Sequence, residues 1–318
     1  MELKPVEKKI LQAMDFHARE PISILARRLK MSKQRVTYNI DNLEKQGVIQ
    51  GYYADINPSK LGITIYLVYL TFHSMSAEKQ ESFIKHLNNY LLSLNVSTQG
   101  KWDHSLAIIA KNIYDFREKY SGIMKSYEQY LKDKRITIVT DFWYYQQVFD
   151  KFDKRESSKM QEPSNKVSLD DIDNKILRML GENCRVSLLD LAEQTKLTPN
   201  AVRSRIKSLE KDKVIISYRV MIDYNKIGKL HYRIFFFLKN DIAHQDRLRE
   251  FLADIPEVIS ITKTEGYADI EIRLITKDLD DFYRIISNIR MSFSEIINEY
   301  EPLLYYKFHK SLNYYPID

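Results

Sequence analysis

The chain repeats itself after 166 residues, and this duplication restricts its possible folds more than any other feature. Lys9-Ile10-Leu11 recurs as Lys175-Ile176-Leu177, and Leu43-Glu44-Lys45 recurs as Leu209-Glu210-Lys211. An interval this long indicates two copies of a set of domains, because solenoid repeats are only about 20–45 residues long. We expect one break in the match, a short insertion between Tyr130 and Arg135 before the last strand of the first copy.

The two copies divide the 318 residues into five segments. Residues 1–57 and 168–224 are predicted to be winged helix-turn-helix domains, and residues 58–149 and 225–318 to be ferredoxin-like domains. Residues 150–167 are predicted to be a flexible linker, because this stretch is polar, charged and nearly free of core-forming side chains. The fold class is therefore α+β, with the two kinds of domain alternating along the chain.

Three short helical patterns open each copy, and the third is the most informative. It begins at a capping residue, which is Ser32 in the first copy and Thr198, followed by Pro199, in the second. Before it, Ser168-Leu-Asp-Asp171 and Ser187-Leu-Leu-Asp190 have the spacing of capping boxes. Apolar residues recur along the third helix at i, i+4 and i+7, so one face must pack inward. They are Val36, Ile40 and Leu43 in the first copy, and Val202, Ile206 and Leu209 in the second.

The opposite face of the third helix is polar and mostly basic, which suits a helix that lies in the major groove of DNA. Amide side chains suit base edges, and Lys and Arg side chains suit phosphates. The alternative is an ordinary solvated helix face. The repetition of the unit and the β-rich segments that follow, at the position of a wing, favour DNA binding. The candidate DNA contacts are Ser32, Lys33, Gln34, Arg35, Tyr38 and Asn39 in the first copy, and Thr198, Asn200, Arg203, Ser204, Arg205 and Lys207 in the second.

After Gly62 and Gly228 the periodicity changes from helical to strand-like. The order of elements becomes β-α-β-β-α-β, which is the ferredoxin-like arrangement. Several strands, such as those at Ile65–Leu70 and Ile234–Leu238, are apolar on both faces. One face can cover the helices, and the other needs a second sheet, which the other copy can supply. The many aromatic residues are therefore assigned to core and interface rather than to base stacking.

The sequence resembles the Lrp/AsnC (feast/famine) family of transcription regulators and, in the Gly100–Asp103 turn followed by Leu106–Lys111, its tandem archaeal members. The resemblance is carried by Leu169–Leu177, Arg185–Ala192, Leu197–Glu210 and Val214–Tyr218, and it is looser in the first copy. It implies a sequence-specific regulator that binds double-stranded DNA. It also implies sensing domains (RAM-type) that dimerise through their sheets and can hold an amino acid or another small effector.

The resemblance further implies an effector site near a Gly-x-x-Asp turn. The matching residues are Gly100 with Asp103, and Gly266 with Asp269. A carboxylate at this place can pair with an amino group of a ligand. The alternative interpretation is a structural turn in which the Asp caps backbone groups.

The two copies are unequal in their third helices. Asn39 stands where the second copy has Arg205, and Asp41 stands where it has Lys207. One chain thus supplies both halves of a pseudo-dimer with two different recognition helices, for which we expect an asymmetric DNA site. Further assembly of the pseudo-dimer is left open by the sequence.

Other classes of protein are disfavoured by the rest of the composition. The single cysteine, Cys184, allows no internal disulfide and suits the cytoplasm, and we expect no signal peptide or membrane-spanning run. The seven His residues lack metal-ligand spacing and no phosphate-binding glycine motif occurs, so no metal, cofactor or catalytic residue is predicted. Two alternatives to a regulator stay open: an enzyme similar to siroheme decarboxylases, which pair two such modules, and an architectural DNA-binding protein.

Overall fold

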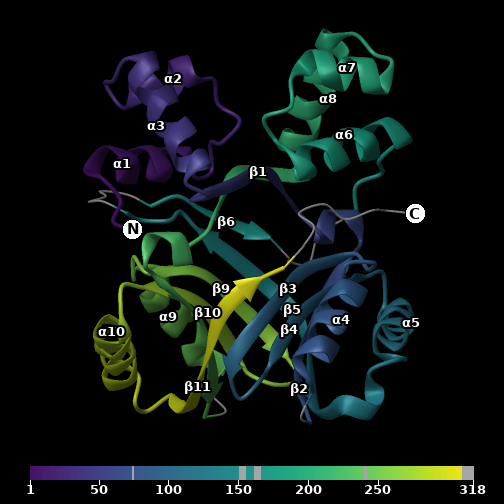
Figure 1. Ribbon diagram of the computed structural model, residues 1–318, viewed down its shortest axis with the longest axis vertical. Helices are drawn as coiled ribbons and strands as arrows, with labels where there is room; N and C mark the ends of the chain where they lie inside the picture. Colours follow the sequence, from purple (N-terminus) through teal and green to yellow (C-terminus); the bar gives the residue numbers. More distant parts are fainter. Residues whose placement is uncertain (74, 150–154, 161–165, 240–241, 310–318) are drawn as a thin grey trace.

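The computed structural model describes residues 1–73, 75–149, 155–160, 166–239 and 242–309. Two three-helix units lie at one end of the molecule, side by side, and a helix-covered β-barrel forms the other end (Figure 1). A two-stranded sheet lies between them. The helices of the two units are α1 (Pro5–Met14), α2 (Ile22–Arg28) and α3 (Lys33–Lys45), and α6 (Asp171–Glu182), α7 (Leu188–Thr195) and α8 (Pro199–Lys211).

The third helix of each unit begins at the capping residue that the sequence predicts. The Ser32 hydroxyl accepts the backbone N–H of Arg35, and the Thr198 hydroxyl accepts that of Ala201, each at 3.2 Å. The inward stripe of each helix is buried, as predicted, and fills the core of its unit.

The first two helices of the second copy start differently from one another. Ser187 caps α7 as predicted and accepts the backbone N–H of Asp190 at 3.0 Å. The predicted cap of α6 at Ser168 is wrong, because Asp170 occupies that position and accepts the backbone N–H of Asp173 at 2.8 Å. A carboxylate is the better cap here, since it also meets the positive end of the helix dipole.

The strand after each third helix pairs with its counterpart from the other copy. These are β1 (Ile49–Ile56) and β7 (Ile215–Ile222), which run antiparallel with Ala54 opposite Tyr218. Each copy supplies only one wing strand, because the chain then enters a 3₁₀ turn, η1 (Ser59–Leu61) or η3 (Asn225–Ile227). The two helical units are therefore joined by a sheet to which both contribute.

The two ferredoxin-like domains have the predicted β-α-β-β-α-β order. Their strands are arranged in the orders β5-β2-β4-β3 and β11-β8-β10-β9. The first contains β2 (Thr64–Phe72), α4 (Ala77–Leu87), β3 (Leu92–Gly100), β4 (His104–Ala110), α5 (Ile113–Met124), η2 (Glu128–Tyr130) and β5 (Leu131–Tyr145). The second contains β8 (Leu230–Leu238), α9 (Ile242–Ala253), β9 (Val258–Glu265), β10 (Ile270–Thr276), α10 (Leu279–Ser292) and β11 (Ile297–Phe308).

The two sheets join at both edges and close into one barrel of eight strands. β5 pairs with β9, and β11 pairs with β3. Helices cover the outside (Figure 1), and the inner faces of the two sheets meet, as in the edge-to-face contact of the Tyr69 and Phe235 rings at 4.9 Å. The expectation that each sheet finds its second partner in the other copy is therefore confirmed. Closure leaves these four strand edges without exposed pairing groups.

The predicted insertion before the last strand of the first copy is wrong. Tyr66 lies opposite Ile138 in one domain, and Tyr232 lies opposite Leu304 in the other. Both pairs keep the 166-residue offset, so the strands β5 and β11 match without a gap.

Part of the predicted linker is a strand rather than a free tether. β6 (Ser157–Met160) pairs with the end of β5. Arg155 donates to the carbonyls of Gln146 at 2.9 Å and Ile255 at 2.8 Å, which ties this segment to both ferredoxin-like domains. Residues 150–154 and 161–165 of the predicted linker lie outside the described residues. In the described ranges, no helix is long and apolar enough to cross a membrane.

Candidate functional site

Ten of the twelve predicted DNA contacts have exposed side chains on α3, α8 or the residue that caps them. They are Ser32, Lys33, Gln34, Arg35 and Tyr38, and Thr198, Asn200, Arg203, Ser204 and Lys207. Within the described residues, none of the four basic members of this set takes part in an ion pair. Their charges are therefore available to phosphates of a bound duplex.

Arg205 turns toward its own domain instead of outward. Its guanidinium donates to Asp170 at 2.7 Å and to Asp173 at 2.8 Å, both at the start of α6. The backbone N–H of Asp173, and then Arg205 itself, lower the pKa of the Asp170 carboxyl below its usual range. Arg205 therefore fixes α8 against the N-terminus of α6, and we remove it from the candidate contacts.

Asn39 is the counterpart of Arg205, and it too is turned inward. Its side chain is buried, and its amide donates to the carbonyl of Arg35 at 2.7 Å. In the first copy the position of Asp170 is held by Lys4 and that of Asp173 by Glu7, so an Arg at position 39 would meet one carboxylate instead of two. Because it is buried and bonded inward, Asn39 also leaves the set of candidate contacts.

The two helical units are fixed to each other by contacts that repeat across a pseudo-two-fold axis. The backbone N–H of Ala18 donates to the Tyr218 carbonyl at 2.9 Å, and that of Cys184 donates to the Tyr52 carbonyl at 3.0 Å. These residues are related by the 166-residue offset.

Two arginines strengthen the same contact. Arg19 donates to the carbonyl of Val186 at 2.9 Å, and Arg185 donates to the carbonyl of Ala18 at 3.0 Å. Because hydrogen bonds of this kind are lost if the units separate, the recognition helices α3 and α8 are held at a fixed spacing. The sequence contained this signal as the repeated pair Arg19 and Arg185, but nothing in it identified their partners.

In both Gly-x-x-Asp turns, the Asp side chain accepts a hydrogen bond from a backbone N–H. Asp103 accepts the N–H of Phe72 at 2.8 Å, and Asp269 accepts the N–H of Leu238 at 2.7 Å. Each carboxylate thus terminates the first strand of its own domain. This geometry is that of the structural turn, which was the alternative interpretation of the motif.

The glycines of these turns lie where the two copies meet. A Cβ at Gly100 would be 3.0 Å from the carbonyl oxygen of Pro302, and one at Gly266 would be 2.8 Å from that of Ile136. Glycine is required there because a strand of the other copy passes close to its backbone. Neither glycine, and neither Asp of the motif, lines the cavities described next.

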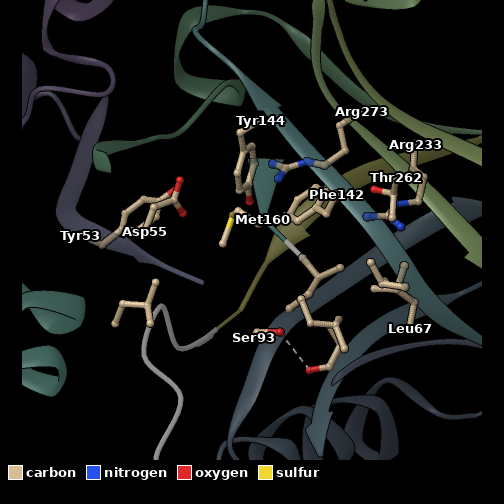
Figure 2. Close-up of a pocket in the computed structure, with 15 residues that line it drawn as sticks. Tyr53, Asp55, Leu67, Ser93, Phe142, Tyr144, Met160, Arg233, Thr262 and Arg273 are labelled. Carbon is tan, nitrogen blue, oxygen red and sulfur yellow. Dashed lines mark hydrogen bonds between the residues drawn. The ribbon is translucent and has the colours of Figure 1, made fainter. Parts of the chain in front are cut away.

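Two adjoining cavities lie between the β1–β7 sheet and the open end of the barrel. The smaller has a volume of about 90 Å³ and the larger about 380 Å³, and both are lined by Tyr53, Tyr144 and Arg273. Figure 2 shows the smaller one, with Tyr53 and Asp55 on β1 facing the side chains of the barrel strands. The sequence did not predict this site, because the residues that line the smaller cavity come from nine separate strands.

Buried charges accompany these cavities. Arg219 on β7 donates to both oxygens of Asp15, at 2.5 and 3.1 Å, and lies 3.6 Å from Asp55. Burial raises the pKa of Asp55, while Arg219 acts against that rise. Sequence reasoning missed this cluster because none of its members recurs in the other copy.

Comparisons with known proteins agree with the fold and the exposed helices. The profile of winged helix-turn-helix DNA-binding domains matches residues 3–50 and 169–216. An HTH-type transcriptional regulator of Pyrococcus horikoshii is 34% identical over 125 residues, which cover 39% of this chain and 77% of the relative. The DNA-binding transcriptional activator DecR of Escherichia coli is 30% identical over 138 residues, 42% of this chain and 90% of DecR. The regulator LrpB of Bacillus subtilis is 31% identical over 102 residues, 32% of this chain and 68% of LrpB.

The chain belongs to the Lrp/AsnC family. It is a DNA-binding transcription regulator in which two family modules are joined in tandem, since DecR is matched over nine-tenths of its length by less than half of this chain. The arrangement of both modules is also similar to the crystal structure of the siroheme decarboxylase NirDL. That likeness has a TM-score of 0.63 at 12% identity and covers 98% of this chain and 94% of NirDL, and it concerns the fold alone.

Proposed function

We propose that this Lrp/AsnC protein binds duplex DNA as a built-in pseudo-dimer, with α3 and α8 reading two unlike half-sites. The observation that carries the proposal is the set of symmetric contacts at Ala18 and Cys184, which hold two exposed recognition surfaces at one end of a single chain. In helix-turn-helix dimers the spacing of the reading heads sets the spacing of the half-sites.

The proposed reading surface excludes the two inward residues and is unequal between the copies. On α8 it contains Arg203 and Lys207, and on α3 the corresponding positions are Thr37 and Asp41. Lys33 and Arg35 supply charge near the start of α3. We therefore expect α8 to bind phosphates more strongly than α3, and the two half-sites to differ in sequence.

Selection from fragmented genomic DNA tests this proposal. Full-length protein is incubated with the fragments at low salt, and the bound fragments are sequenced and footprinted. We expect protection of two unlike half-sites about one helical turn apart, and an affinity that falls steeply as salt rises. Recovery of no fragment above background, at low salt and with folded protein, would contradict the proposal.

We also propose that the protein acts by binding rather than by catalysis, in the cytoplasm, and that a small effector modulates it. The family membership supports the regulatory role, and the cavities beside β1 offer a place for the effector. An architectural protein would instead coat DNA without sequence preference, which the same selection would reveal as unselected fragments with long footprints.

An enzyme is the second candidate, because the likeness to NirDL extends over both modules. The test is the visible absorption spectrum of the protein after addition of siroheme, followed by analysis of the recovered tetrapyrrole. We expect neither a bound spectrum nor loss of carboxyl groups, and decarboxylated product formed by the chain would favour the enzyme.

A further inference from the structure

We infer that the cavity between β1 and the barrel binds a small carboxylic acid with an apolar body, and that Arg273 holds its carboxylate. Arg273 lies on β10 and lines both cavities, and Figure 2 shows its guanidinium beside Tyr144 on the side that faces β1. Nothing in the Gly-x-x-Asp turns contributes to this site.

Arg273 is the one arginine of this cavity system for which the described residues provide no acidic partner. Arg219 is paired with Asp15 at 2.5 Å, and Arg233 is paired with Glu271 inside the barrel. Arg273 instead donates its Nε–H to Nε2 of His231 at 3.1 Å. Its two terminal nitrogens have no hydrogen bond to any of the described residues.

His231 is no counter-ion for this guanidinium, because an imidazole ring is either neutral or positively charged. Burial, and then the neighbouring Arg273 and Arg233, lower the pKa of His231 well below its usual range, so the ring is neutral. Because Nε2 accepts from Arg273, the ring proton is on Nδ1, which is buried and has no acceptor among the described residues. A charged, half-buried guanidinium thus faces the cavity, and a carboxylate is the group that binds it in a two-point geometry.

The rest of the smaller cavity selects an apolar body. Its volume of about 90 Å³ is somewhat less than the roughly 150 Å³ of a protein cavity that holds benzene, and it shares Tyr53, Tyr144 and Arg273 with the lining of the larger cavity. A short branched aliphatic chain is therefore the largest group that we expect to fit beside Arg273. The apolar lining consists of Ile65, Leu67, Val139, Phe142 and Met160.

Asp55 provides a second polar group on the β1 side of the same cavity (Figure 2). Its carboxylate already accepts the Ser217 hydroxyl at 3.0 Å and lies 3.6 Å from the Arg219 guanidinium, with which a ligand ammonium would share it. An ammonium group on the ligand would find a negative partner there, so amino acids and simple carboxylic acids share the proposed chemistry and differ only at this position.

The site is single, although the chain is duplicated. The repeat places Ala107 where the second copy has Arg273, and Ala107 lines the same cavity. We therefore expect one ligand per chain. The methyl group of Ala107 also offers a position from which the cavity can be filled without altering the guanidinium.

A ligand at this site would contact both the barrel and the strand that leads from a recognition helix. Tyr53 and Asp55 lie on β1, which begins four residues after the end of α3. Any difference in ligand affinity between two arrangements of the helical units would shift their populations and hence DNA affinity. This consequence rests on the proposed DNA-binding function, whereas ligand binding itself does not.

Calorimetric titration of the full-length protein without DNA tests the site. The probes are 4-methylpentanoate, L-leucine and L-leucinamide, which lacks the carboxylate. We expect at least one of the two carboxylates to bind with one molecule per chain, and leucinamide to bind at least tenfold more weakly. Arg273→Gln should weaken carboxylate binding at least tenfold, and Arg290→Gln, a matched change of an exposed arginine on α10, should leave it unchanged.

A second variant keeps the test decisive if Arg273→Gln does not fold. Ala107→Met fills the cavity and should also abolish binding, with folding checked by circular dichroism. The inference is overturned if neither carboxylate binds to folded protein at millimolar concentration, if leucinamide binds equally well, or if both folded variants bind like the unaltered protein. Because no DNA is present, failure of the DNA-binding proposal would not affect these results.

Discussion

At the residue scale, position in the helix decides whether a charged side chain is exposed to solvent or supports the fold. Arg203 and Arg205 are two residues apart on α8, which places them about 200° apart around the helix. Arg203 is exposed, while Arg205 bonds to Asp170 and Asp173. The sequence alone assigned both to DNA, because the identity of a basic residue does not reveal which carboxylates will lie beside it in the fold.

We predict that loss of Arg205 affects stability, whereas loss of Arg203 affects DNA binding. In a double-mutant cycle with Asp173→Asn, Arg205→Ala should show a coupling of about 0.5–1 kcal/mol in the free energy of unfolding, since the pair is partly exposed to solvent. Arg203→Ala should show no coupling with Asp173, and should weaken DNA binding by roughly fivefold without changing stability. Urea unfolding and DNA titration measure the two quantities. Coupling at Arg203 instead of Arg205 would refute the assignment.

A buried histidine makes the folded protein sensitive to acid. His104 is buried and bonds Asn95 at 2.8 Å, and burial lowers its pKa from 6.5 to about 3. The unfolded chain therefore binds a proton between these two pH values that the folded chain does not, so stability is lost as the pH falls below about 6.5.

We predict that His104→Gln, which retains a donor for Asn95, removes part of this acid sensitivity. Between pH 7.5 and 5.0, the unaltered protein should lose about 2 kcal/mol more unfolding free energy than the variant. His231 titrates in the same direction and stays in both proteins, so only the difference is diagnostic. Equal losses, measured by urea unfolding at the two pH values, would show that His104 does not titrate in this way.

At the element scale, strand order and helix faces could be predicted, whereas pairing between the copies could not. The periodicity of Val202, Ile206 and Leu209 identified a buried face because it depends on side chains. The pairs β1 with β7 and β5 with β9 depend mainly on backbone hydrogen bonds, which are the same for every residue type. Gly100 and Gly266 are local signs of the barrel junctions, since each lies close to a strand of the other copy, but no such glycine marks the pairing of β1 with β7.

We predict that the junction glycines tolerate no side chain. At Gly266, φ is +114° and a Cβ would lie 2.8 Å from a carbonyl of β5, so Gly266→Ala should cost about 3 kcal/mol of unfolding free energy. Gly228→Ala, with φ at +67° and open space, should cost about 1 kcal/mol. Gly51→Ala, with open space on β1, is the matched control and should change stability by under about 0.5 kcal/mol. A Gly266 variant as stable as the Gly51 variant would mean that the barrel does not close at this junction.

At the scale of the whole molecule, duplication has allowed the two halves to diverge without losing their assembly. The repeated contacts at Ala18 and Cys184 preserve the pseudo-two-fold relation, while Arg273 and Ala107 show that corresponding positions lining one cavity have diverged. A homodimer cannot vary in this way, because each substitution appears in both subunits.

The recognition helices α3 and α8 have also diverged, so they should contribute unequally to DNA binding. We predict that Arg203→Ala with Lys207→Ala weakens binding to the selected site more than Lys33→Ala with Arg35→Ala, and that each pair lowers the salt slope by up to about 2. Each pair should remove protection from a different half-site in footprints. Asp41→Ala, which removes a negative charge from the face of α3, should leave affinity unchanged or raise it. Equal losses for the two pairs, together with a palindromic footprint, would mean that the copies read DNA alike, and the asymmetry proposed here would be wrong.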